Sequence, residues 1–160
     1  MEALLKRVYS SRKISLALKI ISYVSALICV AIFISTLTIL YLNEPRRAVK
    51  TLFAAGIPFV FVSVARKLIN APRPYELYDF YEVKPKGKAG QSFPSRHVFS
   101  AFIIAVLSSL ASLWLAVIAF VMGTALAVSR VLLGMHFIRD VAAGALLGLV
   151  CGILGAIILV

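Results

Sequence analysis

The sequence predicts an all-α integral membrane protein, a single helical bundle with about five transmembrane helices. The chain of 160 residues is 62% hydrophobic and has a mean hydropathy of +1.01, whereas a soluble domain is typically about 45–50% apolar. Its apolar residues also come in runs near the roughly 20 residues that a helix needs to cross a bilayer. The length favours one domain over residues 1–160. We therefore expect a multi-pass protein of the cell membrane.

The first half of the chain contains two of the expected spans, at 20–42 and 48–69, joined by a polar turn at 43–47. Gly56 and Pro58 are expected to kink the second span. Residues 1–18 form a basic segment that is expected to lie on the membrane surface as an amphipathic helix. Between 70 and 96, prolines, glycines, lysines and aromatic rings indicate an interfacial loop.

The second half, from His97 to Val160, is almost continuously apolar and long enough for three spans. Breaks are expected near 108–112 and at 134–140. Five spans return the N-terminus, the 66–97 region and the 129–140 region to the same membrane face. Polar clusters that are far apart in the sequence are therefore expected to meet at one surface.

The formal net charge is +11, from 17 Lys and Arg against 6 Asp and Glu. Because the basic residues flank apolar helices, the expected partners are the lipid bilayer and a phosphorylated lipid, and no nucleic acid is expected. Cys29 and Cys151 lie in apolar runs and are expected to be packing residues.

Three glycines recur every four residues in the last apolar run, at Gly144, Gly148 and Gly152. Small residues at this spacing let helices approach closely. Two alternatives fit the pattern, namely packing within the chain and the seam of a homodimer.

The only two histidines of the chain, His97 and His136, each stand in a short polar motif. His97 closes the segment 94–97, and His136 lies between Arg130 and Asp140. A third cluster of cations, at 66–67 and Arg73, lies upstream. Because ionisable groups at membrane depth are costly and mark functional sites, this concentration predicts an enzyme.

The arginines of these clusters suit phosphate chemistry. A guanidinium group is planar, stays charged and matches phosphate oxygens with a fork of donors. Arg66, Arg73 and Arg130 are expected to converge on one phosphate, where their field favours the charge of a pentavalent transition state. Ser95 and the amides of 95–97, at the start of a helix, are further expected donors.

The histidines supply the expected covalent chemistry. If His136 and Asp140 are both helical, their spacing of four places them on one face. A carboxylate on one ring nitrogen makes the other more nucleophilic, so His136 is expected to attack phosphorus and form a phosphohistidine. His97 is the expected general acid for the departing lipid alkoxide and then the base for water. No metal or other cofactor is expected, since the arginines supply the positive charge.

Taken together, the motifs resemble those of the type 2 phosphatidic acid phosphatase superfamily, which includes bacterial phosphatidylglycerophosphate phosphatases, undecaprenyl-diphosphate phosphatases, lipid A phosphatases and soluble vanadium haloperoxidases. The family pattern is a lysine, six residues and Arg-Pro; then Pro-Ser-Gly-His; then Ser-Arg, five residues, His, three residues and Asp. The third motif matches without exception, at Ser129, Arg130, His136 and Asp140.

The other two motifs match with one departure each. Arg96 replaces the glycine of the second motif, between Ser95 and His97. In the first motif Arg73-Pro74 matches, Arg66 stands at the lysine position, and Lys67 is one residue too late. Either Arg66 or Lys67 is therefore expected to face the phosphate.

This resemblance implies a nucleophile at His136, an orienting carboxylate at Asp140 and an acid/base at His97. It implies phosphate contacts from Arg66 or Lys67 and from four further residues, Arg73, Ser95, Arg96 and Arg130. The expected function is hydrolysis of a lipid phosphomonoester or diphosphate, with phosphatidylglycerophosphate or phosphatidate as the leading substrate class. The alternatives are an undecaprenyl-diphosphate phosphatase, a phosphotransferase, and a non-catalytic binder or carrier of anionic lipids.

Overall fold

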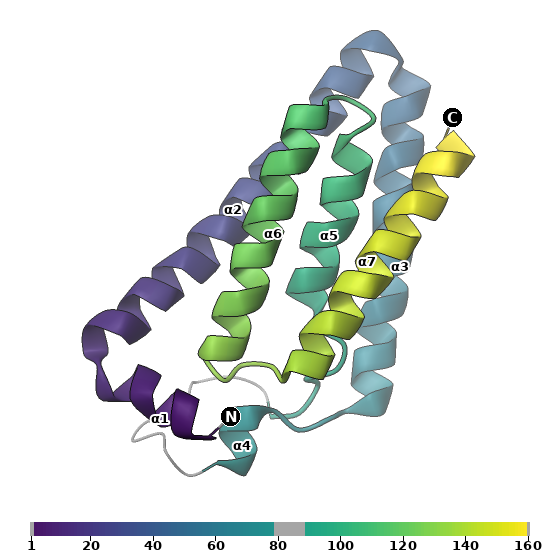
Figure 1. Cartoon of the computed structure of the whole chain (residues 1–160). Coiled ribbons are helices and arrows are strands. Elements are labelled where there is room, and N and C mark those ends of the chain that lie inside the picture. The colour runs from purple at the N-terminus through teal and green to yellow at the C-terminus, as the bar shows by residue number, and fades with distance from the viewer. Residues whose placement is uncertain (1, 79–88, 160) are drawn as a thin grey trace.

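The computed structural model describes residues 2–78 and 89–159, with side chains from Leu5 onward. All regular structure in these residues is helical, as the sequence predicts (Figure 1). The elements in chain order are α1 (Glu2–Ser10), α2 (Arg12–Asn43), α3 (Pro45–Ile69), α4 (Pro74–Leu77), α5 (Arg96–Ser108), α6 (Leu113–Leu132) and α7 (Ile138–Leu159).

Five helices, α2, α3, α5, α6 and α7, run along the long axis of the bundle in alternating directions (Figure 1). In the described part of the chain, α2, α3, α6 and α7 are long and apolar enough to cross a membrane. The fifth helix, α5, has only 13 residues. At 1.5 Å per residue it measures roughly 20 Å, short of the roughly 30 Å hydrocarbon core. Four spanning helices and one shorter one thus make a multi-pass membrane bundle.

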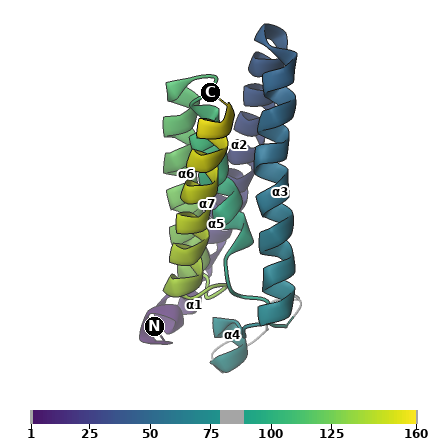
Figure 2. The same ribbon diagram turned by 90° about the vertical axis from the view of Figure 1, so that its right-hand side faces the viewer.

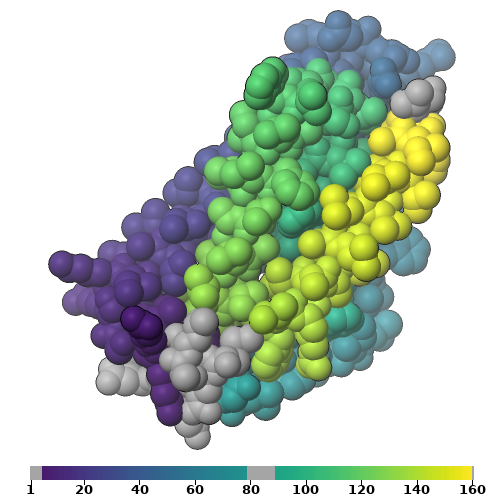
Figure 3. Space-filling model, viewed as in Figure 1, coloured from purple at the N-terminus to yellow at the C-terminus, as the bar shows by residue number. Residues whose placement is uncertain are grey.

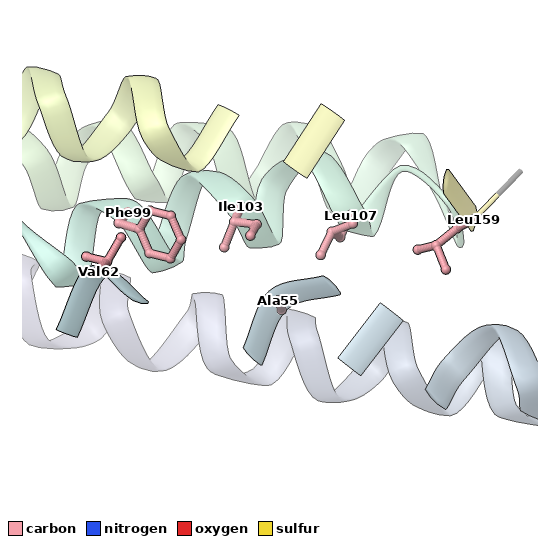
Figure 4. Close-up of a cluster of buried hydrophobic side chains, with 6 residues drawn as sticks. All are labelled: Ala55, Val62, Phe99, Ile103, Leu107 and Leu159. Carbon is pink, nitrogen blue, oxygen red and sulfur yellow. The ribbon is translucent and has the colours of Figure 1, made fainter. Parts of the chain in front are cut away.

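The short helix α5 is the centre of the bundle. It contacts α2, α3, α6 and α7, and nine of its 13 residues are buried. One cluster of buried side chains follows α5 where it faces α3 and α7 (Figure 4), with members Ala55, Val62, Phe99, Ile103, Leu107 and Leu159. In the space-filling view α5 is seen only between α6 and α7 (Figure 3). This packing fixes the N-terminal end of α5, which carries Arg96 and His97, against the neighbouring helices.

Several helix boundaries differ from those expected. The first long helix begins at Arg12 and not at 20, so residues 12–18 of the expected surface segment belong to α2, and only α1 is a separate helix. The reason is that 12–19 contains no proline or glycine to stop it. Pro58 lies inside the uninterrupted α3. The expected breaks at 108–112 and 134–140 lie at 109–112 and 133–137.

The glycines of α7 decide between the two alternatives for their face. A Cβ on Gly144 would lie 2.5 Å from the carbonyl oxygen of Ser95, and one on Gly148 would lie 2.6 Å from that of Phe99. At Gly152 the nearest atom, the Cβ of Val106, would be 2.7 Å away. The stripe therefore brings α7 against α5 of the same chain. A homodimer seam through these glycines is wrong, because α5 already covers their face.

The predicted convergence of the N-terminus and the motif regions is also seen. At one end of the bundle lie α1, α4 and the turn between α6 and α7, while the α2–α3 turn lies at the other (Figure 2). The Tyr9 hydroxyl donates to the Leu133 carbonyl at 3.0 Å and so ties α1 to the α6–α7 turn. We refer to the end with α1, α4 and the α6–α7 turn as the motif end, and to the end with the α2–α3 turn as the turn end. Residues 79–88 of the expected interfacial loop lie outside the described residues.

Candidate active site

The second and third sequence motifs are in direct contact at the motif end, and the segment 90–92 joins the first motif to them. Ser95 N–H donates to the Asp140 carbonyl at 2.9 Å. The Arg66 guanidinium donates to the carbonyl of Gln91. His136 Nδ1 lies 2.9 Å from the Ser92 carbonyl oxygen. Segments up to about 70 residues apart thus form one polar cluster.

The imidazole of His136 is 1% exposed. It stands in the turn between α6 and α7, so its place depends on tertiary contacts. A carbonyl oxygen only accepts hydrogen bonds, so the contact with Ser92 O puts the proton on Nδ1. The other ring nitrogen, Nε2, then keeps its lone pair. This is the tautomer that a nucleophilic histidine needs.

Asp140 meets His136 less directly than expected. Its Oδ2 is 3.9 Å from His136 Nδ1, which is beyond hydrogen-bond distance. The condition for a shared helix face, that both residues are helical, is not met, because α7 begins at Ile138. Instead, Oδ2 accepts from the Phe137 amide at 3.0 Å and from the Ser92 hydroxyl. A carboxylate at the third residue of a helix that bonds back in this way caps the helix start.

Ser92 is the residue that the sequence motifs missed. It is fully buried. Its hydroxyl donates to Asp140, its carbonyl accepts from His136, and Oγ is 3.3 Å from His136 Nδ1. The hydroxyl therefore bridges the carboxylate and the imidazole. Its only sequence signal is its position two residues before Pro94, at the edge of the second motif.

Burial lowers the pKa of His136 below the ordinary value of 6.5, and the positive charges of Arg73 and Arg66 lower it further. The Asp140 carboxylate acts in the opposite direction. The net direction is downward, because taking the imidazole out of water disfavours its cation. His136 is therefore neutral at neutral pH.

The structure separates the two cations of the first motif. Arg66 is 7% exposed and points into the cluster, while Lys67 is exposed. Arg66 is within electrostatic range of three further arginines, Arg73, Arg96 and Arg130. A buried cation beside three other cations is costly without a bound anion. Arg66 is thus the member of the pair that faces the site.

The segment 89–92 is held by hydrogen bonds to Arg66 of α3 and to the residues that follow α3. Arg73 Nε donates to the Gly90 carbonyl at 3.0 Å, and Gly90 N–H donates to Glu76 at 2.7 Å. Gly90 has φ of +72°, and a Cβ there would lie 2.3 Å from Asn70 Oδ1. Only glycine fits this position. The close turn at Gly90 places Ser92 in contact with the imidazole of His136.

Two buried donors of the motifs, Ser95 Oγ and Arg130 Nε, lack partners among the described residues, and the buried acceptor Asp140 Oδ1 has no hydrogen bond there either, with Arg139 Nε 3.5 Å away. In the described part of the chain, the Arg130 guanidinium donates one side-chain hydrogen bond, from its terminal nitrogen to the Met135 sulfur at 3.4 Å. Buried donors normally find acceptors. A phosphate group offers acceptor oxygens of the kind that both donors lack.

His97 and Arg96 lie at the border between the cluster and the lipid-facing helices. Both are exposed, and both line an apolar cavity of about 250 Å³. The Arg96 guanidinium stacks over the Phe59 ring, 5.5 Å from its centre. His97 is within electrostatic range of His136 and Arg130. The site therefore has a buried polar side and an open apolar side.

These features define a polytopic membrane protein with a buried histidine inside a ring of arginines at one membrane face. Residues 19–159 match the family model of the PAP2 superfamily. The chain belongs to this superfamily, the type 2 phosphatidic acid phosphatases that its motifs resemble.

Individual relatives agree with the family. A lipid A 1-phosphatase of Porphyromonas gingivalis is 34% identical over 92 residues, which is 55% of this chain and 20% of that protein. The matched part of the chain spans about a fifth of that relative's length.

Two crystal structures share the fold. Aquifex aeolicus LpxE has a TM-score of 0.70 and 24% identity, covering 96% of this chain and 93% of that one. A PAP2-type phosphatidylglycerolphosphate phosphatase of Bacillus subtilis has a TM-score of 0.74 and 22% identity, covering 98% and 83%.

Proposed function

We propose that the protein is a lipid phosphatase of the cell membrane, which hydrolyses a phosphomonoester or diphosphate of a lipid headgroup through a phosphohistidine. The observation that carries this proposal is the buried, neutral His136 within a cluster of arginines, with Nδ1 bonded to a carbonyl and with no hydrogen bond to Nε2 from the described residues. The superfamily and the named activities of the P. gingivalis and B. subtilis relatives support it. Phosphatidylglycerophosphate or phosphatidate is the proposed substrate class.

In the first step His136 Nε2 attacks phosphorus and the bond from phosphorus to the lipid oxygen breaks. The departing alkoxide takes a proton from His97. Arg66, Arg73 and Arg130 hold the phosphoryl oxygens, where their charge lowers the energy of the transition state. Ser95 Oγ and the Arg96 amide are further donors at the start of α5.

In the second step His97 removes a proton from water. The resulting hydroxide attacks phosphorus, the bond between phosphorus and Nε2 breaks, and inorganic phosphate leaves. Asp140 and Ser92 hold the imidazole in its Nδ1-protonated form throughout. Both histidines return to their starting protonation, so the cycle balances.

The test is phosphate release by the purified protein, in detergent with a chelator, from a panel of lipid phosphates and diphosphates. His136→Ala is expected to lower turnover at least roughly 10⁴-fold. Labelled substrate quenched in alkali should leave the label on His136 of the unaltered protein. Full activity of the His136→Ala variant removes the mechanism, and release from no substrate in the panel favours a lipid binder.

The lipid tail is proposed to enter from the side, between α2 and α3. The 250 Å³ cavity at His97 adjoins a second apolar cavity of about 160 Å³, and Phe59, Ser100 and Ile104 line both. Together they form a path from the polar cluster toward the middle of the bundle. Gly56 lines the second cavity, and a Cβ added there meets no atom within 4 Å.

Gly56→Phe is therefore expected to fill the path without disturbing the backbone. Turnover of a dioleoyl phosphate lipid should fall roughly tenfold relative to the dioctanoyl lipid, since a bulky ring displaces several methylenes. Gly56→Ala is the matched control and should change neither rate. Equal losses with both chain lengths would contradict the tail path while leaving the phosphatase proposal intact.

A further inference from the structure

A separate apolar groove lies at the turn end of the bundle, away from the motif end and from the two cavities described above. It has a volume of about 510 Å³ and runs between α3 and α7, lined among others by Phe53 and Ile57 from α3 and by Leu154 and Ile158 from α7. All four side chains are at least half exposed. Beside the groove the two helices cross closely, because a Cβ on Gly155 would lie 3.1 Å from that of Ala54. The groove is thus a preformed apolar groove on the lipid-facing surface.

Cations stand where the groove reaches the end of α3. Lys50 is exposed and lines it. Arg46 and Arg47 precede Lys50 by four and three residues, so all three lie on neighbouring parts of the helix surface. Arg47 Nε is buried with no hydrogen-bond partner in the described part of the chain. The segment 43–50 carries these three cations against a single carboxylate, Glu44.

We propose that this groove binds one acyl chain of an anionic phospholipid, with its phosphate held by Lys50, Arg46 and Arg47. The chain would lie along α3 from Lys50 to Pro58, roughly 12 Å at 1.5 Å per residue, which is most of one leaflet's roughly 15 Å of hydrocarbon. The cations select the charge of the headgroup, because an anionic membrane surface attracts each nearby Lys or Arg.

A second copy of the chain is the less suitable occupant. A two-fold contact along this groove would bring the three cations of one copy near those of the other, and like charges at an interface oppose association. An anionic lipid instead neutralises the cations. This site is independent of the proposed phosphatase activity, and its test measures binding.

The test is native mass spectrometry of the full chain in a neutral detergent, titrated with dioleoyl phosphatidylglycerol or dioleoyl phosphatidylcholine. Phosphatidylglycerol is a phosphodiester and has no terminal phosphate to lose. The unaltered protein should bind the first lipid tightly at this groove and the second at least roughly tenfold more weakly. The double variant Arg47→Gln/Lys50→Gln should lose the tightly bound phosphatidylglycerol. Its affinity for this lipid at the groove should fall at least roughly tenfold.

Lys19→Gln, which removes one exposed cation elsewhere, is the matched control and should keep the tight site. Ile57→Trp fills the groove and keeps its cations, so it tests the same site if the double variant does not fold; it should also lose the tightly bound lipid. Thermal unfolding followed by circular dichroism checks the fold of each. Equal binding of the two lipids, unchanged binding by the double variant, or a dimer as the main species would overturn the proposal.

Discussion

The two ends of α3 carry cations in opposite ways. At the motif end Arg66 is buried, donates to the Gln91 carbonyl and lies among other arginines. At the turn end Arg46 and Lys50 are exposed beside an apolar groove. Both ends look alike in the sequence, as basic residues that flank an apolar run. The difference teaches that a cation becomes part of a buried polar cluster when another segment of the chain packs over it, whereas an exposed cation stays open to the membrane surface.

The largest effect expected along α3 separates Arg66 from its sequence neighbour. Arg66→Gln should lower kcat/KM for a lipid phosphate roughly 10²–10³-fold, because a buried donor to the transition state is lost. Lys67→Gln, its exposed neighbour, should stay within about twofold, as should Lys50→Gln at the turn end. The rates are measured on a dioctanoyl phosphate lipid in detergent. A large loss for Lys67→Gln and none for Arg66→Gln would reverse the assignment.

The sequence predicted the helical fold and the meeting of the motifs because hydropathy and span counting depend on local composition. Counting apolar spans could not predict that α5 is short. A helix of this length is tolerated because four longer helices surround it. Nor could spacing choose a side for the glycines of α7, since Gly144 and Gly148 pack on the backbone of Ser95 and Phe99 in α5, far away in the sequence.

Within the site, sequence reasoning reached the residues with distinctive chemistry and missed the one that joins them. Histidine and arginine are rare in apolar helices, so His97, His136 and Arg130 stand out. Ser92 is one of many serines, and its bonds to Asp140 and His136 arise only when α7 packs beside the 89–92 segment. The spacing of His136 and Asp140 suggested a direct contact, but the start of α7 at Ile138 prevents it.

A smaller effect tests this bridge. Ser92→Ala removes the hydroxyl and keeps the carbonyl that accepts from His136, so kcat should fall roughly 10–100-fold, as for other supporting hydrogen bonds. KM should change little, because Ser92 does not face the phosphate. Ser92→Thr, which restores the hydroxyl, should recover most of the rate. If Ser92→Thr is as slow as Ser92→Ala, while both keep the unfolding temperature of the unaltered protein, Ser92 does not position His136 through its hydroxyl.

The smallest expected effect is a displacement along the pH axis. Protonated His136 has no lone pair for phosphorus, so kcat/KM should fall tenfold per pH unit below its pKa. Burial lowers that pKa, so the midpoint of the acid limb should lie below 6.5. An aryl phosphate with a good leaving group is the suitable substrate, because its departure does not need the His97 proton.

The sign of this displacement can be checked with one variant. The Asp140 carboxylate raises the pKa of His136, so Asp140→Asn should move the acid limb to still lower pH while reducing the rate. Lys50→Gln at the turn end should leave the pH profile superimposable, because its cation is far from the imidazole. A midpoint above 6.5, or a shift of the limb to higher pH in Asp140→Asn, would mean that the titrating group is not a buried imidazole stabilised as a cation by this carboxylate. The nucleophile would then lie at the exposed side of the site and not beneath the segment 89–92. That packed segment is what distinguishes the motif end from the turn end.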